Sequence, residues 1–260
     1  MTYTETLDFL YNRLPMFHRI GPAAYKNSLE NTLLIDEYFG HPHRNFKSVH
    51  VAGTNGKGSV SHMLAAVFQQ AGYKTGLYTS PHLVDFRERI RINGAMIPEQ
   101  EVTDWVEKHA VGQNLWNIEP SFFELTVALA FDYFSRQEAD IAIIEVGLGG
   151  RLDSTNIITP EVSVITNIGY DHVQLLGDTL EKIAGEKAGI IKGGVPVVIG
   201  ETNPGTENVF RNAAVKRNAP VFFADQEFKA GYSLLSLDGK QVLNILRDDS
   251  PAFTDLRIDL

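Results

Sequence analysis

Residues 51–59 read Val-Ala-Gly-Thr-Asn-Gly-Lys-Gly-Ser and separate a β-branched run from an apolar segment with helical periodicity. A glycine-rich turn between a strand and a helix presents backbone N–H groups at a helix N-terminus, and Lys57 adds a positive charge. The spacing departs from G-x-x-x-x-G-K-[ST], because Val51 occupies the first glycine position and Gly58 follows Lys57. A plain tight turn is the alternative interpretation. The residues predicted to bind phosphate are Thr54, Asn55, Gly56, Lys57, Gly58 and Ser59.

Short segments rich in Val and Ile alternate with helical patterns over most of the chain. The predicted strands are 47–51, 75–79, 141–146, 162–168, 195–199 and 221–224. The predicted helices are 29–38, 58–71, 98–109, 121–136, 179–188 and 205–217. The alternation indicates an α/β fold, namely a P-loop-type doubly wound, mainly parallel sheet with helices on both faces. Ligands of such sheets bind beyond the carboxyl ends of the strands.

The C-terminal part of the chain follows a different pattern. Asp238 and Gly239 lie between two apolar runs, which predicts a β-hairpin. We expect one domain over residues 1–260, with a core over about 46–224 and a β-hairpin tail over about 225–260.

The composition excludes several classes of protein. A net charge of -9 leaves no overall basic surface for nucleic acid. No apolar run of about eighteen residues occurs, so we expect no membrane span, and the N-terminus has no secretory signal pattern. The absence of cysteine excludes disulfides and thiol catalysis and is compatible with the cytoplasm. We therefore expect a cytoplasmic monomer whose partners are small molecules.

Polar side chains lie at the ends of three predicted strands. Ser80 follows 75–79, Glu145 lies near the end of 141–146, and His172 follows 162–168. These strand ends can converge on the loop that holds Lys57. Oxygen ligands suit Mg²⁺, so Ser80 and Glu145 are suitable ligands, whereas histidine is a less usual one. A strand-ending turn for Ser80 and a loop or core position for His172 are the alternatives.

Other residues could contribute to the same site. Lys187 lies late on a predicted helix, where a cation is also favoured by the helix dipole. Phe122 and Phe123 open a predicted helix, and each could either pack in the core or stack on a flat heterocycle. Gly147 and the glycines that follow it permit either a tight turn or the close approach of a ligand.

Five stretches in order resemble the N-terminal ATP-binding domain of the folylpolyglutamate synthase/dihydrofolate synthase family, part of the Mur ligase superfamily. They are Gly53–Ser59, Ser80–His82, Glu145–Asp153, Asp171–His172 and Glu186–Ile190. The resemblance implies an ATP-dependent carboxylate–amine ligase. Such an enzyme would add L-glutamate to dihydropteroate, to reduced folates or to both, through an acyl phosphate.

The resemblance also implies roles for individual residues. Thr54 to Ser59 would surround the ATP phosphates, and Lys57, His172 and Lys187 would be catalytic. Two Mg²⁺ ions would be held with Ser80, Glu145 and His172 as ligands, and Lys187 would be carbamylated. Phe123 would stack on the pterin. The substrate-binding residues would be Ser121, Phe122, Phe123, Glu124, Leu152, Asp153 and Ser154.

The chain departs from the family pattern at its end. Family members carry a second, C-terminal α/β domain, and this sequence stops about where the linker would begin, so we expect a fragment with weak ATP binding and little ligase activity. A different Mur-type amino-acid ligase is one alternative function. A non-catalytic ATP- or pterin-binding module is another.

Overall fold

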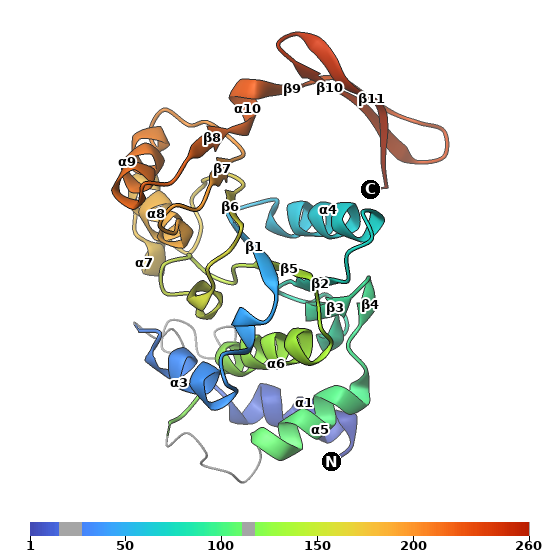
Figure 1. Cartoon of the computed structure of the whole chain (residues 1–260), viewed down its shortest axis with the longest axis vertical. Coiled ribbons are helices and arrows are strands. Elements are labelled where there is room, and N and C mark those ends of the chain that lie inside the picture. The colour runs from blue at the N-terminus through green and yellow to red at the C-terminus, as the bar shows by residue number, and fades with distance from the viewer. Residues whose placement is uncertain (16–27, 111–117, 260) are drawn as a thin grey trace.

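An eight-stranded sheet forms the centre of the computed structural model, which describes residues 1–15, 28–110 and 118–259 (Figure 1). The strand order is β4-β3-β2-β5-β1-β6-β7-β8, and only the pairs β4–β3 and β3–β2 are antiparallel. The predicted mainly parallel α/β sheet is therefore confirmed. Its strands are β1 (Lys47–Ala52), β2 (Thr75–Tyr78), β3 (Ile90–Ile92), β4 (Ala95–Met96), β5 (Ile141–Glu145), β6 (Val162–Ile165), β7 (Val197–Ile199) and β8 (Val221–Phe223).

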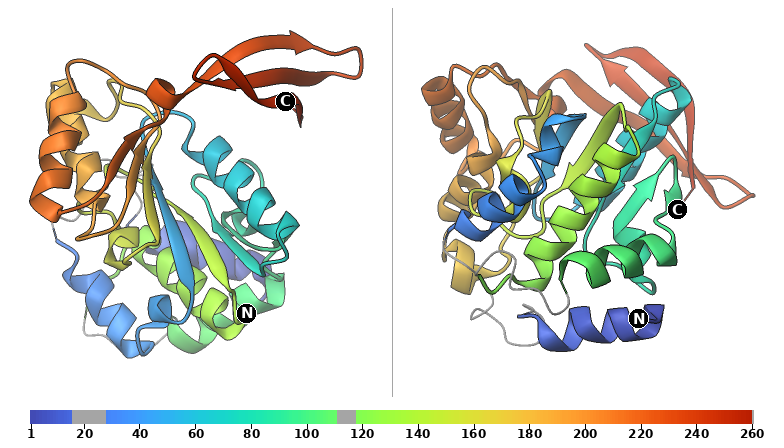
Figure 2. Two further views of the ribbon diagram at one scale, coloured as in Figure 1. Left: turned by 45° about the horizontal axis from the view of Figure 1, so that its top comes forward. Right: turned by 60° about the horizontal axis from the view of Figure 1, so that its bottom comes forward.

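Helices cover both faces of this sheet, as predicted (Figure 2). The α-helices are α1 (Tyr3–Asp8), α3 (Glu30–Tyr38), α4 (Lys57–Gln70), α5 (Glu99–His109), α6 (Phe122–Arg136), α7 (Val173–Leu176), α8 (Leu180–Lys187), α9 (Glu207–Arg217) and α10 (Ala224–Glu227). Shorter helical turns are η1 (Phe9–Arg13), η3 (Pro42–Arg44), η4 (Phe86–Arg89), η5 (Ser154–Ile157) and η6 (Ala188–Ile190). No helix within the described ranges is long and apolar enough to cross a membrane.

Alternate residues of the central strands pack into different cores. Val49 and Val51 of β1 pack with Ala65 of α4 on one face. On the other face, Ala142 and Ile144 of β5 pack in a core that includes residues of α5 and α6. A third core joins β6 and β7 to α8 and α9 on this second face. Strands β1, β2 and β5 are consequently buried on both sides, which explains their nearly continuous apolar sequences.

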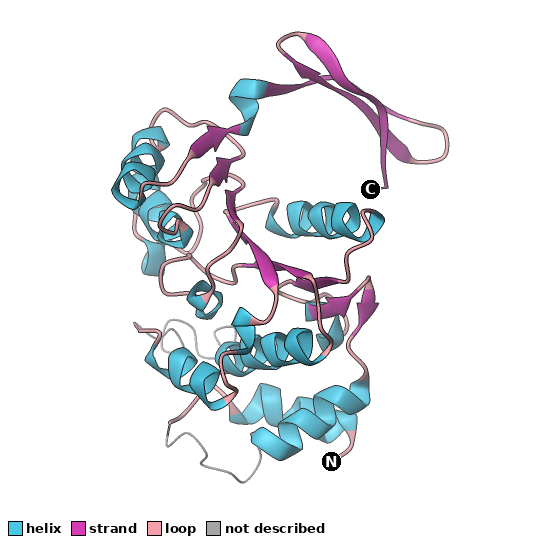
Figure 3. Cartoon of the chain, in the orientation of Figure 1, coloured by secondary structure: helices cyan, strands magenta, loops and turns pink. Residues whose placement is uncertain are grey.

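Two parts of the fold differ from the sequence-based expectation. Strands β3 and β4 form a short hairpin around Asn93 and Gly94, and the prediction left this hairpin out. The predicted C-terminal hairpin is a three-stranded antiparallel sheet (Figure 3). Its strands are β9 (Phe228–Leu235), β10 (Lys240–Arg247) and β11 (Ser250–Asp259). The last strand was left out of the prediction, although Leu256 and Ile258 alternate with Asp255, Arg257 and Asp259 as expected for a strand.

Candidate functional site

The glycine-rich loop links β1 to α4 and has the backbone geometry that only glycine allows. Gly56 lies directly before the first residue of α4 and has a φ of +80°. Gly53 has a φ of +148°, and a Cβ atom there would lie 1.8 Å from the hydroxyl oxygen of Thr166. Both positions therefore require glycine for the turn and for close packing.

Residues just after β6 hold this loop in place. The amide of Thr54 donates to the carbonyl of Asn167 at 3.0 Å, and the amide of Asn55 donates to Asn167 Oδ1 at 2.9 Å. The hydroxyl of Thr166 donates to the carbonyl of Asn55 at 2.6 Å. Neither Thr166 nor Asn167 was among the predicted site residues. Their signal was available, because they are polar residues at the end of an apolar strand.

Two lysines converge on the loop from different helices. Lys57 Nζ donates to the carbonyl oxygens of Gly53 at 3.2 Å and Thr54 at 3.1 Å. Lys187 Nζ, from the end of α8, donates to the same Gly53 oxygen at 2.9 Å. Lys187 is only 3 % exposed, and burial, reinforced by the charge of Lys57, lowers its pKa to about 8. The loop is thus flanked by two basic groups.

Glu145 ends β5 on the side of the sheet that α4 covers. Its Oε2 atom accepts a hydrogen bond from the Ser80 amide at 3.1 Å and lies 3.9 Å from the position of a Cβ on Gly58. Burial raises the pKa of Glu145 to about 7, opposed by the Ser80 hydrogen bond and by the charge of Lys57. Lys57, Ser80, Glu145 and Lys187 therefore border one region of the molecule.

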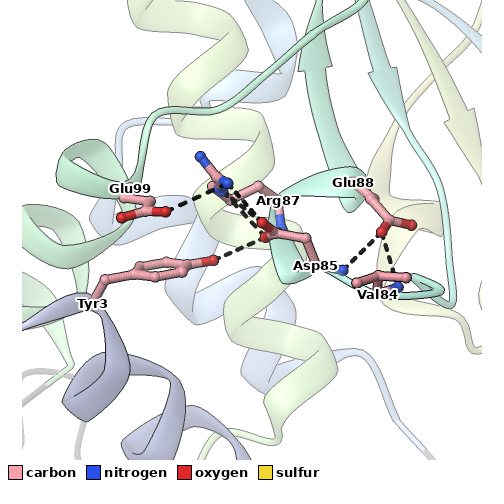
Figure 4. A network of polar contacts seen from close by, with 6 residues as sticks. All are labelled: Tyr3, Val84, Asp85, Arg87, Glu88 and Glu99. Atoms are coloured by element: carbon pink, nitrogen blue, oxygen red, sulfur yellow. Dashed lines mark hydrogen bonds and ion pairs between the residues drawn. The ribbon is translucent and has the colours of Figure 1, made fainter.

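Ser80 begins a turn that is fixed by its own hydrogen bonds. The peptide bond between Ser80 and Pro81 is cis. Three amides of the turn donate to the carboxylate of Glu88, at 2.8 Å from Leu83, 2.9 Å from Val84 and 2.7 Å from Asp85. Figure 4 shows the Val84 and Asp85 bonds, together with the contacts that Asp85 makes with Tyr3 and Arg87. The Ser80 hydroxyl therefore lies on a well-anchored turn.

His172 is related to this region through its neighbour Asp171. His172 directly precedes α7 with a φ of +46°, and its Nε2 atom lies 3.6 Å from Asp171 Oδ1. Asp171 is also the nearby charge that most favours the ionised form of Lys187. Among the described residues, no group of three or more His, Asp or Glu side chains is arranged to hold a metal ion. The Ser80, Glu145 and His172 ligand set remains a prediction.

The Mur ligase middle domain matches residues 51–241, which contain the glycine-rich loop, both lysines and Glu145. The chain belongs to the Mur ligase family. Its similarity extends to folylpolyglutamate and dihydrofolate synthases and covers the N-terminal part of those enzymes.

Three relatives illustrate the extent of the similarity. The dihydrofolate synthase/folylpolyglutamate synthase of Bacillus subtilis is 43 % identical over 88 % of this chain and 55 % of its own length. The apo form of L. casei folylpolyglutamate synthase superposes with a TM-score of 0.88 at 35 % identity. A folylpolyglutamate synthase complex with AMPPCP and folate gives 0.86 at 35 % identity. Each structural match covers all of this chain and 62 % of the other.

In this Mur ligase domain, Phe122 and Phe123 lie in different environments. Phe122 is buried, and the guanidinium of Arg89 lies 5.2 Å from its ring centre. Phe123 faces the glycine-rich turn after β5, because a Cβ atom on Gly147 would lie 2.3 Å from Phe123 Cζ. The ring of Phe123 also meets Tyr78 edge-on, with centroids 6.3 Å apart. Phe122 is thus a core residue, whereas Phe123 borders the candidate site.

Most of the other predicted substrate-binding residues make internal contacts. Ser121 and Glu124 cap α6 reciprocally: the Ser121 amide donates to Glu124 at 2.7 Å, and the Glu124 amide donates to Ser121 Oγ at 3.2 Å. Asp153 accepts hydrogen bonds from the amides of Leu148 and Thr155, at 2.8 and 3.0 Å. Leu152 is half-buried, and Ser154 is buried at the start of η5.

Proposed function

We propose that this chain supplies the nucleotide-binding part of an ATP-dependent carboxylate–amine ligase. Its substrates would be L-glutamate and dihydropteroate, a reduced folate or both. The observation that carries the proposal is the meeting of Lys57 and Lys187 at Gly53, with Glu145 across the start of α4. The names of the relatives and the complex with AMPPCP and folate support the same activity. Because the chain spans 55 % of the length of the Bacillus subtilis relative, the whole reaction is a proposal.

The chemistry needs charge neutralisation and positioning more than covalent help from the protein. The substrate carboxylate attacks the γ-phosphorus of ATP, the bond to the bridging oxygen breaks, and an acyl phosphate and ADP form. The amine of glutamate then attacks the acyl carbon, and phosphate leaves as the amide forms. Lys57 and the first amides of α4 would stabilise the phosphate oxygens during the first transfer.

The donor set around Glu145 suits a hard divalent cation. The carboxylate is buried at the end of an apolar strand, and its raised pKa shows that burial disfavours its ionised form. A bound Mg²⁺ would reverse that effect and would neutralise the phosphate charge. The residues that would hold it are Ser80, Glu145 and His172.

Lys187 has the environment that carbamylation requires. A pKa of about 8 leaves about one tenth of its amine uncharged at pH 7, far more than the ordinary lysine pKa would allow. The free amine would attack carbon dioxide, a C–N bond would form, and the proton would leave to solvent. The resulting carbamate would supply anionic oxygens, which suits a second Mg²⁺.

Of the two aromatic residues that open α6, Phe123 is the better placed for stacking on a pterin. It is only partly buried against the core and lies against Gly147. We further propose one domain with a core over about 46–224 and a tail over about 225–260, acting as a cytoplasmic monomer.

Calorimetric titration of this chain with AMPPCP and Mg²⁺ tests the nucleotide site, and dihydropteroate is then added to test the pterin site. We expect both to bind and a nucleotide-linked muramyl substrate to have no effect. Binding of the muramyl substrate in place of dihydropteroate would favour the other Mur-type ligases. Phosphate release with glutamate then tests for ligation, of which we expect little from this chain, and substantial turnover would exclude a module that only binds its ligands.

A further inference from the structure

His50 lies in the middle of β1, on the face opposite α4, and is completely buried. Its Nε2 atom lies 2.8 Å from the hydroxyl of Thr155 in η5. Its Nδ1 atom has no hydrogen-bond partner. A buried imidazole with one nitrogen partnered and the other bare is costly, so the single contact to Thr155 needs an explanation.

The hydroxyl of Thr155 also contacts Asp153 and therefore fixes the direction of the hydrogen bonds. A threonine hydroxyl has one proton, which it donates to Asp153 Oδ1. The contact with His50 must then run the other way, with Nε2–H donating to the Thr155 oxygen. This assigns the neutral Nε2–H tautomer to His50 and leaves Nδ1 without a proton, in agreement with its lack of a partner.

The carboxylate of Asp153 is held by donors from the protein itself. Its Oδ1 atom accepts from the amide and hydroxyl of Thr155, and its Oδ2 atom accepts from the amide of Leu148. Burial raises the pKa of Asp153. The hydrogen bonds from Thr155 and Leu148, together with the backbone of Gly147, oppose that rise. These bonds fix the orientation of the carboxylate.

These contacts form a chain from β1 to the turn that carries Gly147, on which the ring of Phe123 lies. We propose that His50 and Thr155 are positioning residues, which hold Asp153 as an internal brace and so fix the Gly147–Leu148 turn beside Phe123. This inference rests on the proposed function only where it concerns the pterin.

The first test is independent of any ligand. Histidine-selective ¹⁵N labelling and a long-range ¹H–¹⁵N correlation spectrum report the tautomer of each imidazole. We expect His50 to show a protonated Nε2 and a bare Nδ1. A protonated Nδ1 would overturn the inference.

The second test uses variants matched in size. His50→Gln keeps an N–H near the Nε2 position, whereas His50→Leu removes it; Thr155→Ser keeps the hydroxyl, whereas Thr155→Val removes it. We expect the Leu148 amide resonance to stay near its wild-type position in the first member of each pair and to move in the second. An unchanged Leu148 resonance in Thr155→Val would overturn the inference, even if His50→Leu fails to fold.

Affinity for dihydropteroate provides the functional readout. We expect a loss of about five- to tenfold in His50→Leu and Thr155→Val, and less than twofold in His50→Gln and Thr155→Ser, with AMPPCP affinity unchanged in all four. Equal losses in both members of a pair would overturn the positioning role. If the wild-type chain does not bind dihydropteroate, the proposed function fails, and the two spectroscopic tests still decide the hydrogen-bond chain.

Discussion

The ammonium groups of Lys57 and Lys187 share one acceptor, the carbonyl oxygen of Gly53, at 3.2 and 2.9 Å. Two positive charges this close repel each other, which contributes to the lowered pKa of Lys187. An anion placed between them would be attracted by both. We therefore propose that the pair forms an electrostatic site for phosphate.

Replacing Lys57 tests this site directly. We expect Lys57→Ala to weaken AMPPCP binding by roughly 10- to 100-fold, because a charge-assisted hydrogen bond contributes about 1.5–3 kcal/mol. Lys182→Ala is the matched control, since Lys182 is an exposed lysine paired with Asp178. Isothermal titration calorimetry at constant ionic strength measures both. Equal affinities in the two variants would remove Lys57 from the phosphate site.

The burial of Lys187 predicts a pH dependence of stability. Its folded pKa of about 8 lies below the ordinary 10.5, so the unfolded chain binds more protons between these values. The free energy of unfolding should therefore rise from pH 8 to pH 10.5, and Lys187→Met should reduce that rise by about 3 kcal/mol. Urea unfolding in buffer free of carbon dioxide measures it. Lys192, whose pKa is also lowered to about 8, contributes equally to both proteins.

We expect the Glu145 carboxylate to lower the stability of the fold and to be required for cation binding. Its folded pKa of about 7 lies above the ordinary 4.5, so its ionised form destabilises the fold increasingly as pH rises through this window. We expect Glu145→Gln to gain up to about 3 kcal/mol of stability at pH 8 and nothing at pH 4. The same variant should lose the part of AMPPCP affinity that depends on Mg²⁺. Retained Mg²⁺ dependence would show that Glu145 is not a ligand.

The contact between Gly147 and Phe123 can be tested by adding one methyl group. Gly147→Ala would place a Cβ atom 2.3 Å from Phe123 Cζ, so we expect a loss of about 1–3 kcal/mol and weaker dihydropteroate binding. The loss should shrink in a Phe123→Ala background, as a double-mutant cycle would reveal. Gly185→Ala, a helical position with no atom within 4 Å, is the control and should be neutral or stabilising.

The sequence predicted the sheet, most helices and the position of Glu145 beside the start of α4, because strand ends on a parallel sheet share one edge. It did not predict that the carboxylates of Glu124 and Asp153 would accept hydrogen bonds from backbone amides of the same chain. Residue type alone does not distinguish a carboxylate that caps a helix from one that faces a ligand. His50 was passed over for a related reason, since its partner Thr155 is 105 residues away.

The three-stranded sheet of β9, β10 and β11 is a single layer, and β9 is exposed along its whole length. Water reaches this ladder from both faces, and Tyr232, Leu235 and Phe253 remain largely uncovered. Such a ribbon opens at a lower free energy than the eight-stranded sheet beside it. Melting of the chain is therefore expected to occur in two steps, and a single midpoint temperature would describe only the larger unit.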